Sequence, residues 1–176
     1  ELIPNFQIGF MPKRLIYDNV LSLDVALRSG AKAAVLDFRK AYDSVSHEAL
    51  SMTLRHLGFP ERFCDTCDSA MSGSTASVYV DKVNSRAFRV ERGVKQGDPL
   101  SPLLFTLVAE LMARSPQSMA STTPKLGNTK LKVPLLQYAD DTVLLSTTDE
   151  GIRNWLQVLD RLEKATGLTI NKTKTH

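Results

Sequence analysis

Two aspartates, Asp140 and Asp141, stand side by side between two mainly apolar runs, Val133–Ala139 and Thr142–Ser146. Adjacent carboxylates repel each other, and a charge at the edge of an apolar core loses hydration. A chain accommodates such a pair most easily at a turn between two strands, where a cation can be shared. The pattern therefore predicts a hairpin with an acidic tip.

A third carboxylate, Asp37, follows another apolar run, residues 31–36, which has the character of a buried strand. Two or three carboxylates that bind two divalent ions about 3.5–4 Å apart make a phosphoryl-transfer site. Without a cation, their repulsion is expected to raise at least one pKa of the cluster. The alternative is that Asp140 and Asp141 only begin a polar turn, since Asp is a common turn residue.

The remaining pattern predicts an α+β fold in which helices pack on one face of an antiparallel sheet. A second hairpin is expected over 75–80 and 86–90, and a surface loop over 115–130. Helices are expected over 18–29, 46–57, 61–72, 103–113 and 149–166, with Ser46, Ser101 and Asp149 as N-caps and Gly30 and Gly167 as stops.

Composition limits the class of protein. With 176 residues, 43% hydrophobic and 23% charged, the chain predicts one domain with a core and excludes a disordered tail. No stretch approaches the ~18 apolar residues of a membrane span, so we expect no membrane partner. Two cysteines cannot form a disulfide framework, which favours an intracellular location. They form a lone Cys64–Cys67 CxxC without a second pair, which disfavours zinc or redox chemistry.

The net charge of +3 is too small to indicate nucleic-acid binding by itself. Its distribution is more informative, because residues 82–95 hold five basic side chains against one glutamate. Such a stretch suits a phosphate backbone, although a solvated strand face explains it as well.

Four ordered segments resemble the motifs of reverse transcriptases, in the form found in non-LTR (LINE-type) retrotransposons. Residues 36–45 resemble motif A, 93–105 motif B, 138–141 motif C and 167–175 motif D. Near the start, Gln7-Ile8-Gly9-Phe10 with Arg14 and Asp18 resembles the segment before motif A. The resemblance covers nearly the whole chain.

This resemblance implies a right-hand polymerase palm, an antiparallel sheet backed by helices, with a residual fingers segment. It implies RNA-directed DNA polymerisation with two Mg²⁺ (or Mn²⁺) ions, an RNA template, a DNA primer and dNTPs; protein partners are undetermined. The whole chain, 1–176, is expected to be one domain fragment, with upstream fingers motifs and thumb outside it. About 1–30 and 58–95 connect fingers and palm, and 31–57 and 96–176 form the palm.

The same resemblance assigns roles to individual residues. Asp37, Asp140 and Asp141 would hold the metal ions, together with the backbone oxygen of Phe38. Lys174 would protonate pyrophosphate as a general acid, unless it is only a solvated lysine.

Substrate and template contacts are implied as well. Tyr42 would be a steric gate against ribonucleotides, with core packing as its alternative role. Gln96 and Gly97 would lie near the incoming nucleotide and the template base. Contacts with nucleic acid would come from Arg14, Arg92 and Lys95.

Two rival functions stay open at this stage. One is a non-catalytic remnant that at most binds nucleic acid. The other is an RNA-dependent RNA polymerase palm, because such palms also space two aspartates as Asp37 and Asp43 are spaced. Tyr42 and the Tyr-Ala-Asp-Asp sequence at 138–141 argue against the second.

Overall fold

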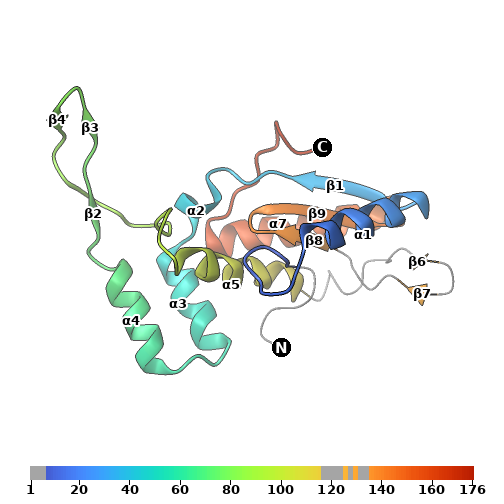
Figure 1. The fold of residues 1–176 in the computed structure, drawn as a ribbon, viewed down its shortest axis with the longest axis horizontal. Helices are drawn as coiled ribbons and strands as arrows, with labels where there is room; N and C mark the ends of the chain where they lie inside the picture. The colour runs from blue at the N-terminus through green and yellow to red at the C-terminus, as the bar shows by residue number, and fades with distance from the viewer. Residues whose placement is uncertain (1–6, 116–124, 127–128, 131–134) are drawn as a thin grey trace.

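The structure is a computed structural model that describes residues 7–115, 125–126, 129–130 and 135–176. Its elements alternate irregularly between helices and strands, as expected for an α+β fold (Figure 1). The helices are α1 (Ile16–Arg28), α2 (Ala41–Ser44), α3 (His47–His56), α4 (Glu61–Met71), α5 (Ser101–Ala113) and α7 (Asp149–Thr166). The strands are β1 (Lys32–Leu36), β2 (Thr75–Ala76), β3 (Tyr79–Val80), β4 (Val83–Asn84), β5 (Phe88–Arg89), β6 (Lys125–Leu126), β7 (Thr129–Lys130), β8 (Leu135–Tyr138) and β9 (Asp141–Ser146).

The central sheet has the strand order β1-β9-β8, and both pairings are antiparallel. Strands β8 and β9 form the predicted hairpin, which closes at the pair Tyr138 and Asp141. Strand β1 pairs with β9 from Lys32 opposite Ser146 to Leu36 opposite Thr142. The middle strand of the sheet is therefore the one that begins with an aspartate.

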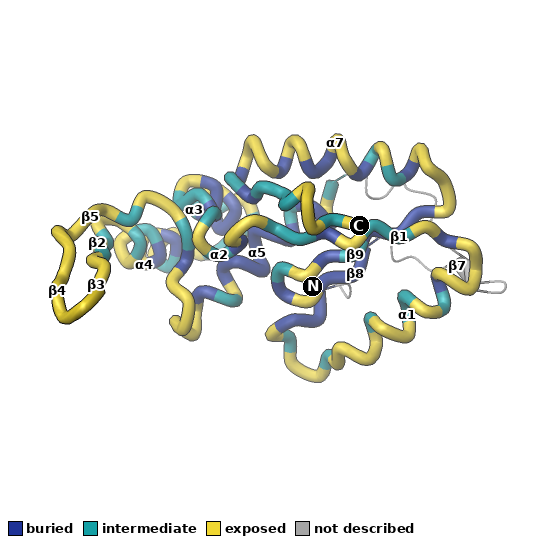
Figure 2. Tube along the Cα trace, turned by 90° about the horizontal axis from the view of Figure 1, so that it is seen from above, coloured by how far each residue is buried: buried dark blue, intermediate teal, exposed yellow. Residues whose placement is uncertain are grey.

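Helices cover both faces of this sheet, so the expectation of helices on one face is wrong. Helix α7 packs on the face that includes Leu36 and Leu144, whereas α1 packs on the opposite face, on Leu136 and Leu145 (Figure 2). Apolar side chains of α5 belong to the same core cluster as Leu36 and Leu144. The physical reason is the continuous apolar run Val143-Leu144-Leu145 in β9, which presents apolar side chains to both faces.

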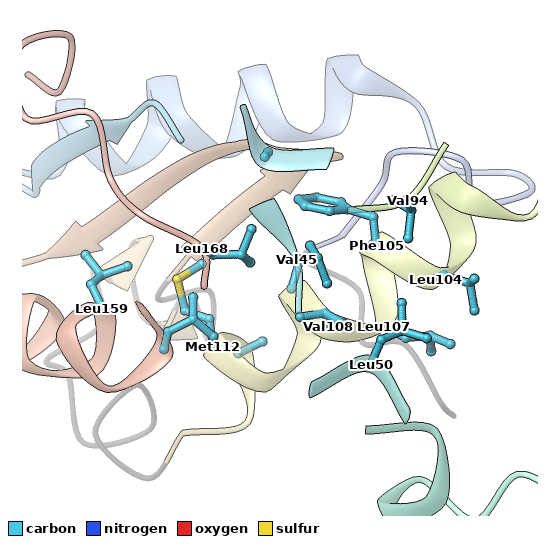
Figure 3. Packing of buried hydrophobic residues seen from close by; sticks show 14 of the residues in the cluster. Val45, Leu50, Val94, Leu104, Phe105, Leu107, Val108, Met112, Leu159 and Leu168 are labelled. Carbon is cyan, nitrogen blue, oxygen red and sulfur yellow. The ribbon is translucent and has the colours of Figure 1, made fainter. Parts of the chain in front are cut away.

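Helix α5 forms the centre of the main core, as its apolar sequence predicts. Figure 3 shows Phe105, Val108 and Met112 of this helix among side chains of several other elements, including Leu159 and Leu168. Phe105 and Met112 are each 1% exposed. The helix therefore fixes the sheet, α3 and α7 relative to one another.

None of the helices in the described part of the chain is both long enough and apolar enough to span a membrane.

The N-caps were predicted correctly in one case of three. Ser46 caps α3 by accepting a hydrogen bond from the amide of Ala49. Ser101 does not cap α5, because the carboxylate of Asp98 accepts from the amides of Leu100 and Ser101, at 2.8 and 3.2 Å. For α7 the cap is Thr148, and Asp149 is the first helical residue. In both helices a neighbouring side chain accepts from amides of the first turn in place of the predicted residue.

The second hairpin forms, but in two separate ladders, β2 with β5 and β3 with β4. It projects away from the rest of the structure (Figure 1). Its tip, Asp81-Lys82, has positive φ at both residues, +49° and +66°. Residues 115–130 were expected to be a loop; β6 and β7 pair there, and the rest of that segment after Ser115 lies outside the described residues.

Cys64 and Cys67 lie on α4 with free thiols, and both are buried in the main core. Burial raises the pKa of the Cys67 thiol, and the neighbouring Cys64 and Asp68 raise it further. A buried thiol with a raised pKa is a poor nucleophile and a poor metal ligand. The structure gives this pair a packing role.

Glu110 of α5 is only 1% exposed, and burial raises its pKa to about 7 although Arg114 and Arg14 act to lower it. An unfolded chain titrates glutamate near pH 4.3, so the folded state binds more protons between these values. The free energy of unfolding must then fall as pH rises through this window.

We expect Glu110→Gln to remove this dependence while preserving the side chain's shape. Between pH 5 and pH 8, the wild type should lose on the order of 2 kcal/mol relative to the variant. Urea unfolding at both pH values measures the difference. Parallel pH profiles for the two proteins would contradict the assignment.

Candidate active site

The pairing of β1 with β9 brings two distant aspartates together. The last pair of that ladder is Leu36 with Thr142, so one further step places Asp37 opposite Asp141. Side chains directly opposite each other lie on the same face of an antiparallel pair. Asp140 occupies the two-residue turn beside them, between Tyr138 and Asp141. The three predicted carboxylates thus share one end of the sheet.

Asp37 and Asp141 lie on the face of the sheet that α1 covers only in part. Helix α1 packs on Ala33, Leu136 and Leu145, at the far end of the sheet. Nearer the carboxylates, Val35 is 47% exposed and Tyr138 is 41% exposed. The acidic end of the face is consequently open to a large ligand.

The surroundings of Asp141 shift the pKa of its carboxyl group. Asp141 stays accessible to solvent, but partial burial is the largest cause that raises its pKa, and the charges of Asp140 and Asp37 raise it further. The sequence predicted a raised pKa from repulsion. Loss of hydration contributes more than repulsion does.

Carboxylate oxygens are the ligands that Mg²⁺ and Mn²⁺ prefer, so the donor set suits such ions. In their present rotamers, however, no three acidic, histidine or cysteine side chains of the described residues are arranged to hold a metal ion. The backbone brings Asp37, Asp140 and Asp141 together, and rotation of their side chains would have to complete a cage. The prediction of converging carboxylates thus holds for the backbone only.

One carboxylate has a partner that the sequence did not reveal. The side-chain amide of Asn171 donates to Oδ2 of Asp37 at 2.9 Å, and its backbone N–H donates to the Asp37 carbonyl at 2.7 Å. Thr173 donates to Oδ1 of Asn171 from both its hydroxyl and its amide, at 2.7 and 3.3 Å. These two donors fix the amide so that its N–H₂ group faces Asp37.

The segment that carries Asn171 runs along the free edge of β1. Phe38 and Ile170 form an antiparallel bridge, and the backbones of Val35 and His176 exchange two hydrogen bonds. Two hydrogen bonds flank this bridge: the N–H of Arg39 donates to Thr169, and the N–H of Asn171 donates to Asp37. Neither uses the carbonyl of Phe38, which the sequence predicted as a metal ligand. Its role stays a prediction.

Tyr42 lies on α2, beside the acidic end. Its ring stacks on Phe105, with centroids 4.7 Å apart and planes at 17°. Burial raises the pKa of Tyr42, and the charge of Asp140 raises it further. Both roles proposed from the sequence, steric gate and core packing, are therefore compatible with its position.

The segment that resembles motif B is tied to α2 through its backbone. The amides of Gly93 and Val94 donate to the carbonyls of Val45 and Tyr42, at 2.7 and 2.8 Å. A Cβ on Gly93 would lie 2.8 Å from Cα of Asp43, so only glycine permits this approach.

Beyond this point, Gln96 and Gly97 lie on an exposed loop. Gly97 has φ +87°, which explains the glycine, and a Cβ there would meet nothing within 4 Å. Among the described residues, no hydrogen bond or ion pair joins Gln96 or Gly97 to Asp37, Asp140 or Asp141. Substrate binding by Gln96 and Gly97 stays a prediction.

The predicted basic residues occupy different places. Lys174 is exposed, on a turn in which its amide donates to the carbonyl of Asn171 at 3.0 Å. Arg14 is half-buried and donates to the backbone carbonyl of Gln7, which favours support of the site over template contact. Arg92, directly before the motif B segment, and Lys95, within it, are both exposed, and their binding of nucleic acid stays a prediction.

Comparison with known proteins defines the class of this palm-like domain. A family model described as reverse transcriptase (RNA-dependent DNA polymerase) matches residues 1–176. The chain therefore belongs to the reverse transcriptase family.

Its relatives confirm the non-LTR character that the motifs indicated. The chain is 38% identical over 175 residues to the Pol polyprotein of the type-2 retrotransposable element R2DM of Drosophila melanogaster, covering 96% of this chain and 16% of that protein. Against the type-1 element R2 of Popillia japonica, identity is 34% over 170 residues, covering 95% and 23%. Against the RNA-directed DNA polymerase from mobile element jockey of Drosophila melanogaster it is 27% over 186 residues, covering 99% and 19%. The chain thus spans less than a quarter of these relatives.

Solved structures confirm the fold. Apo telomerase from Candida tropicalis, truncated from its C-terminal domain, superposes with a TM-score of 0.69 at 16% identity, covering 97% of this chain and 35% of that one. Telomerase from Candida albicans, in complex with a fragment of telomeric RNA, gives 0.69 at 15%, covering 97% and 32%. The sheet and its helices form a polymerase palm.

The contact between Asn171 and Asp37 can be tested without measuring activity. Asn171→Ala should lower the free energy of unfolding by roughly 1.5 kcal/mol, because it removes a hydrogen bond to a charged group. In an Asp37→Ala background the same change should cost less, with a coupling of at least about 0.5 kcal/mol. Urea unfolding of the four proteins of this cycle measures it, with Asn84→Ala, an exposed asparagine of β4, as the control. Additive costs would show that the two side chains do not interact.

Proposed function

We propose that this chain is the catalytic palm of a reverse transcriptase that adds deoxynucleotides to a primer 3′-hydroxyl on an RNA template. The observation that carries the proposal is the meeting of Asp37, Asp140 and Asp141 at the open end of a palm sheet. The chain covers only 16–23% of the relatives compared. The polymerase activity of this chain is therefore a proposal.

In this proposal the three aspartates, with the carbonyl of Phe38, would hold two Mg²⁺ or Mn²⁺ ions. When bound, such ions activate the primer hydroxyl and neutralise charge on the triphosphate and the leaving pyrophosphate. The chain's own contribution is to keep acidic groups together at a fixed sheet end. Asn171 holds one of them, Asp37, by its side-chain amide.

The remaining residues would select and orient the substrates. Tyr42, held flat on Phe105, would close the space that a ribose 2′-hydroxyl needs. Gln96 and Gly97 would meet the nucleotide and template base, and Arg92 and Lys95 would meet phosphates. Lys174 would give a proton to pyrophosphate, a role supported by its place on a turn anchored to Asp37 through Asn171.

Primer extension on an RNA template tests this function. The chain alone, which spans less than a quarter of its relatives, should bind nucleic acid weakly and extend the primer poorly. The reason is that displacement of the primer end or the triphosphate by about 1 Å costs about 10²-fold in rate. Joined to the remaining segments of the R2DM Pol polyprotein, of which it covers 16%, it should extend the primer in Mg²⁺ or Mn²⁺. Asp140→Asn should then lower the rate by roughly 10³-fold, because several kcal/mol of charge stabilisation are lost.

The matched control is Asp160→Asn, at an exposed aspartate of α7 paired with Lys164. It should leave extension unchanged. No extension by the joined protein would favour an inert remnant, and preferential use of ribonucleotides would favour an RNA polymerase.

Sugar selection is tested at Tyr42 in the same joined protein. Tyr42→Val should admit ribonucleotides and largely keep deoxynucleotide use, because a smaller side chain removes the clash without changing the aspartates. Tyr42→Phe keeps the ring and should keep discrimination. The measurement is the ratio of kcat/KM for the two sugars. If Tyr42→Val leaves that ratio unchanged, Tyr42 only packs against Phe105.

A further inference from the structure

The turn that carries Asp140 has a backbone conformation that needs support. Ala139, its first residue, has φ +54°, in the left-handed region. A Cβ makes this region unfavourable for alanine, and such conformations persist where the surroundings hold them. Asp140 and Asp141 follow directly and repel each other. Contacts from outside the hairpin would therefore stabilise this turn.

The side chain of Gln7 makes the contacts that hold it. Its Oε1 accepts a hydrogen bond from the N–H of Ala139 at 3.0 Å, and its Nε2 donates to the carbonyl of Ala139 at 3.2 Å. Gln7 is only 1% exposed, so water competes little for these bonds. One amide therefore satisfies both backbone groups of the residue with positive φ.

The orientation of this amide is fixed by a second donor. The N–H of Gly9 also donates to Oε1 of Gln7, at 2.9 Å. Reversing the amide would turn its N–H₂ group toward two backbone donors. The amide is thus set to accept from Ala139 N–H and to donate to its carbonyl.

The segment around Gln7 is itself fitted to the turn. The N–H of Ile8 donates to the carbonyl of Gln137 at 3.0 Å, and Arg14 donates to the carbonyl of Gln7. A Cβ on Gly9 would lie 2.3 Å from the nitrogen of Ala139, so any other residue there would push the two segments apart. These contacts bring the residues before α1 against the turn.

We propose that Gln7 is a positioning residue for the acidic site, because its side chain fixes the Ala139 peptide and thereby the directions of Asp140 and Asp141. This proposal rests on the proposed function insofar as the positioned groups bind divalent metal. The Gln7 side chain bonds the backbone of Ala139, so it would act on Asp140 and Asp141 only through the turn.

The test compares two buried glutamines. Gln7→Met removes the amide and keeps the bulk. Gln137→Met makes the same change on β8, at a glutamine that is also 1% exposed and whose amide atoms have no partner among the described residues. Two readouts are used on the whole chain: hydrogen exchange at the Ala139 amide, and Mn²⁺ affinity by calorimetry.

Gln7→Met should lose protection of the Ala139 amide and weaken Mn²⁺ binding by about 10-fold or more, as loss of groups that orient metal ligands usually does. Gln137→Met should change neither. Adding Ala139→Gly to Gln7→Met should recover much of the Mn²⁺ affinity, because glycine adopts positive φ without support. A general loss of folding in Gln7→Met would instead remove exchange protection throughout the sheet and not at the turn alone.

The results separate the two hypotheses. Unchanged Mn²⁺ affinity in Gln7→Met, or unchanged protection of Ala139, overturns the positioning role. A wild type that binds no Mn²⁺ overturns the proposed metal function. In that case, hydrogen exchange at the Ala139 amide still decides whether Gln7 holds the turn. Lost protection in Gln7→Met supports this role, and unchanged protection contradicts it.

Discussion

The antiparallel pairing of β1 with β9 is the interaction on which the rest of the structure depends. Its register, with Leu36 opposite Thr142, is what places Asp37 opposite Asp141. A slip of one residue would turn each side chain of a strand to the other face. A slip of β9 would bring the exposed Asp141 to the buried position of Thr142, on the face where Leu36 and Leu144 pack, and its charge would lose hydration there. The core thereby fixes the position of the acidic groups.

Holding like charges together is unfavourable, and the surrounding contacts offset that cost locally. Partial burial and the two neighbouring carboxylates raise the pKa of Asp141. Asn171 gives Asp37 a hydrogen-bond donor, and Gln7 holds the turn before Asp140. Two segments remote in sequence, one before α1 and one after α7, therefore brace the same end of the sheet. These contacts hold the three carboxylates in fixed positions, which is what stabilisation of charge by preorganised groups requires.

The sequence predicted those features that depend on local pattern. Apolar runs located β1, β8 and β9, the all-apolar segment located α5, and the ordered motifs identified the family. It also contained the signal for a sheet covered on both faces, in Val143-Leu144-Leu145, but the irregular alternation of elements favoured one-sided packing. The failed caps, Ser101 and Asp149, each lost to a nearby residue whose reach depends on loop geometry.

Contacts between residues far apart in the chain could not be predicted from pattern. Nothing in the sequence near Asn171 indicates that its amide meets Asp37, or that the amide of Gln7 meets Ala139. Such pairs arise only when the register of the sheet and the docking of both flanking segments are set. Gln7 and Asn171 both lie in segments that resemble motifs of the family. That resemblance is the sequence signal that could have pointed to these two residues.

The central claim is that one end of this sheet is a divalent-metal site. Paramagnetic broadening by Mn²⁺ in ¹⁵N-labelled protein tests it most directly. At low Mn²⁺, the account predicts loss of amide signals at Asp37, Phe38, Asp140 and Asp141 before any others. A second acidic cluster, the carboxylates around Arg55, serves as the internal comparison. Loss of signals there first, with those of the sheet end retained, would contradict the account.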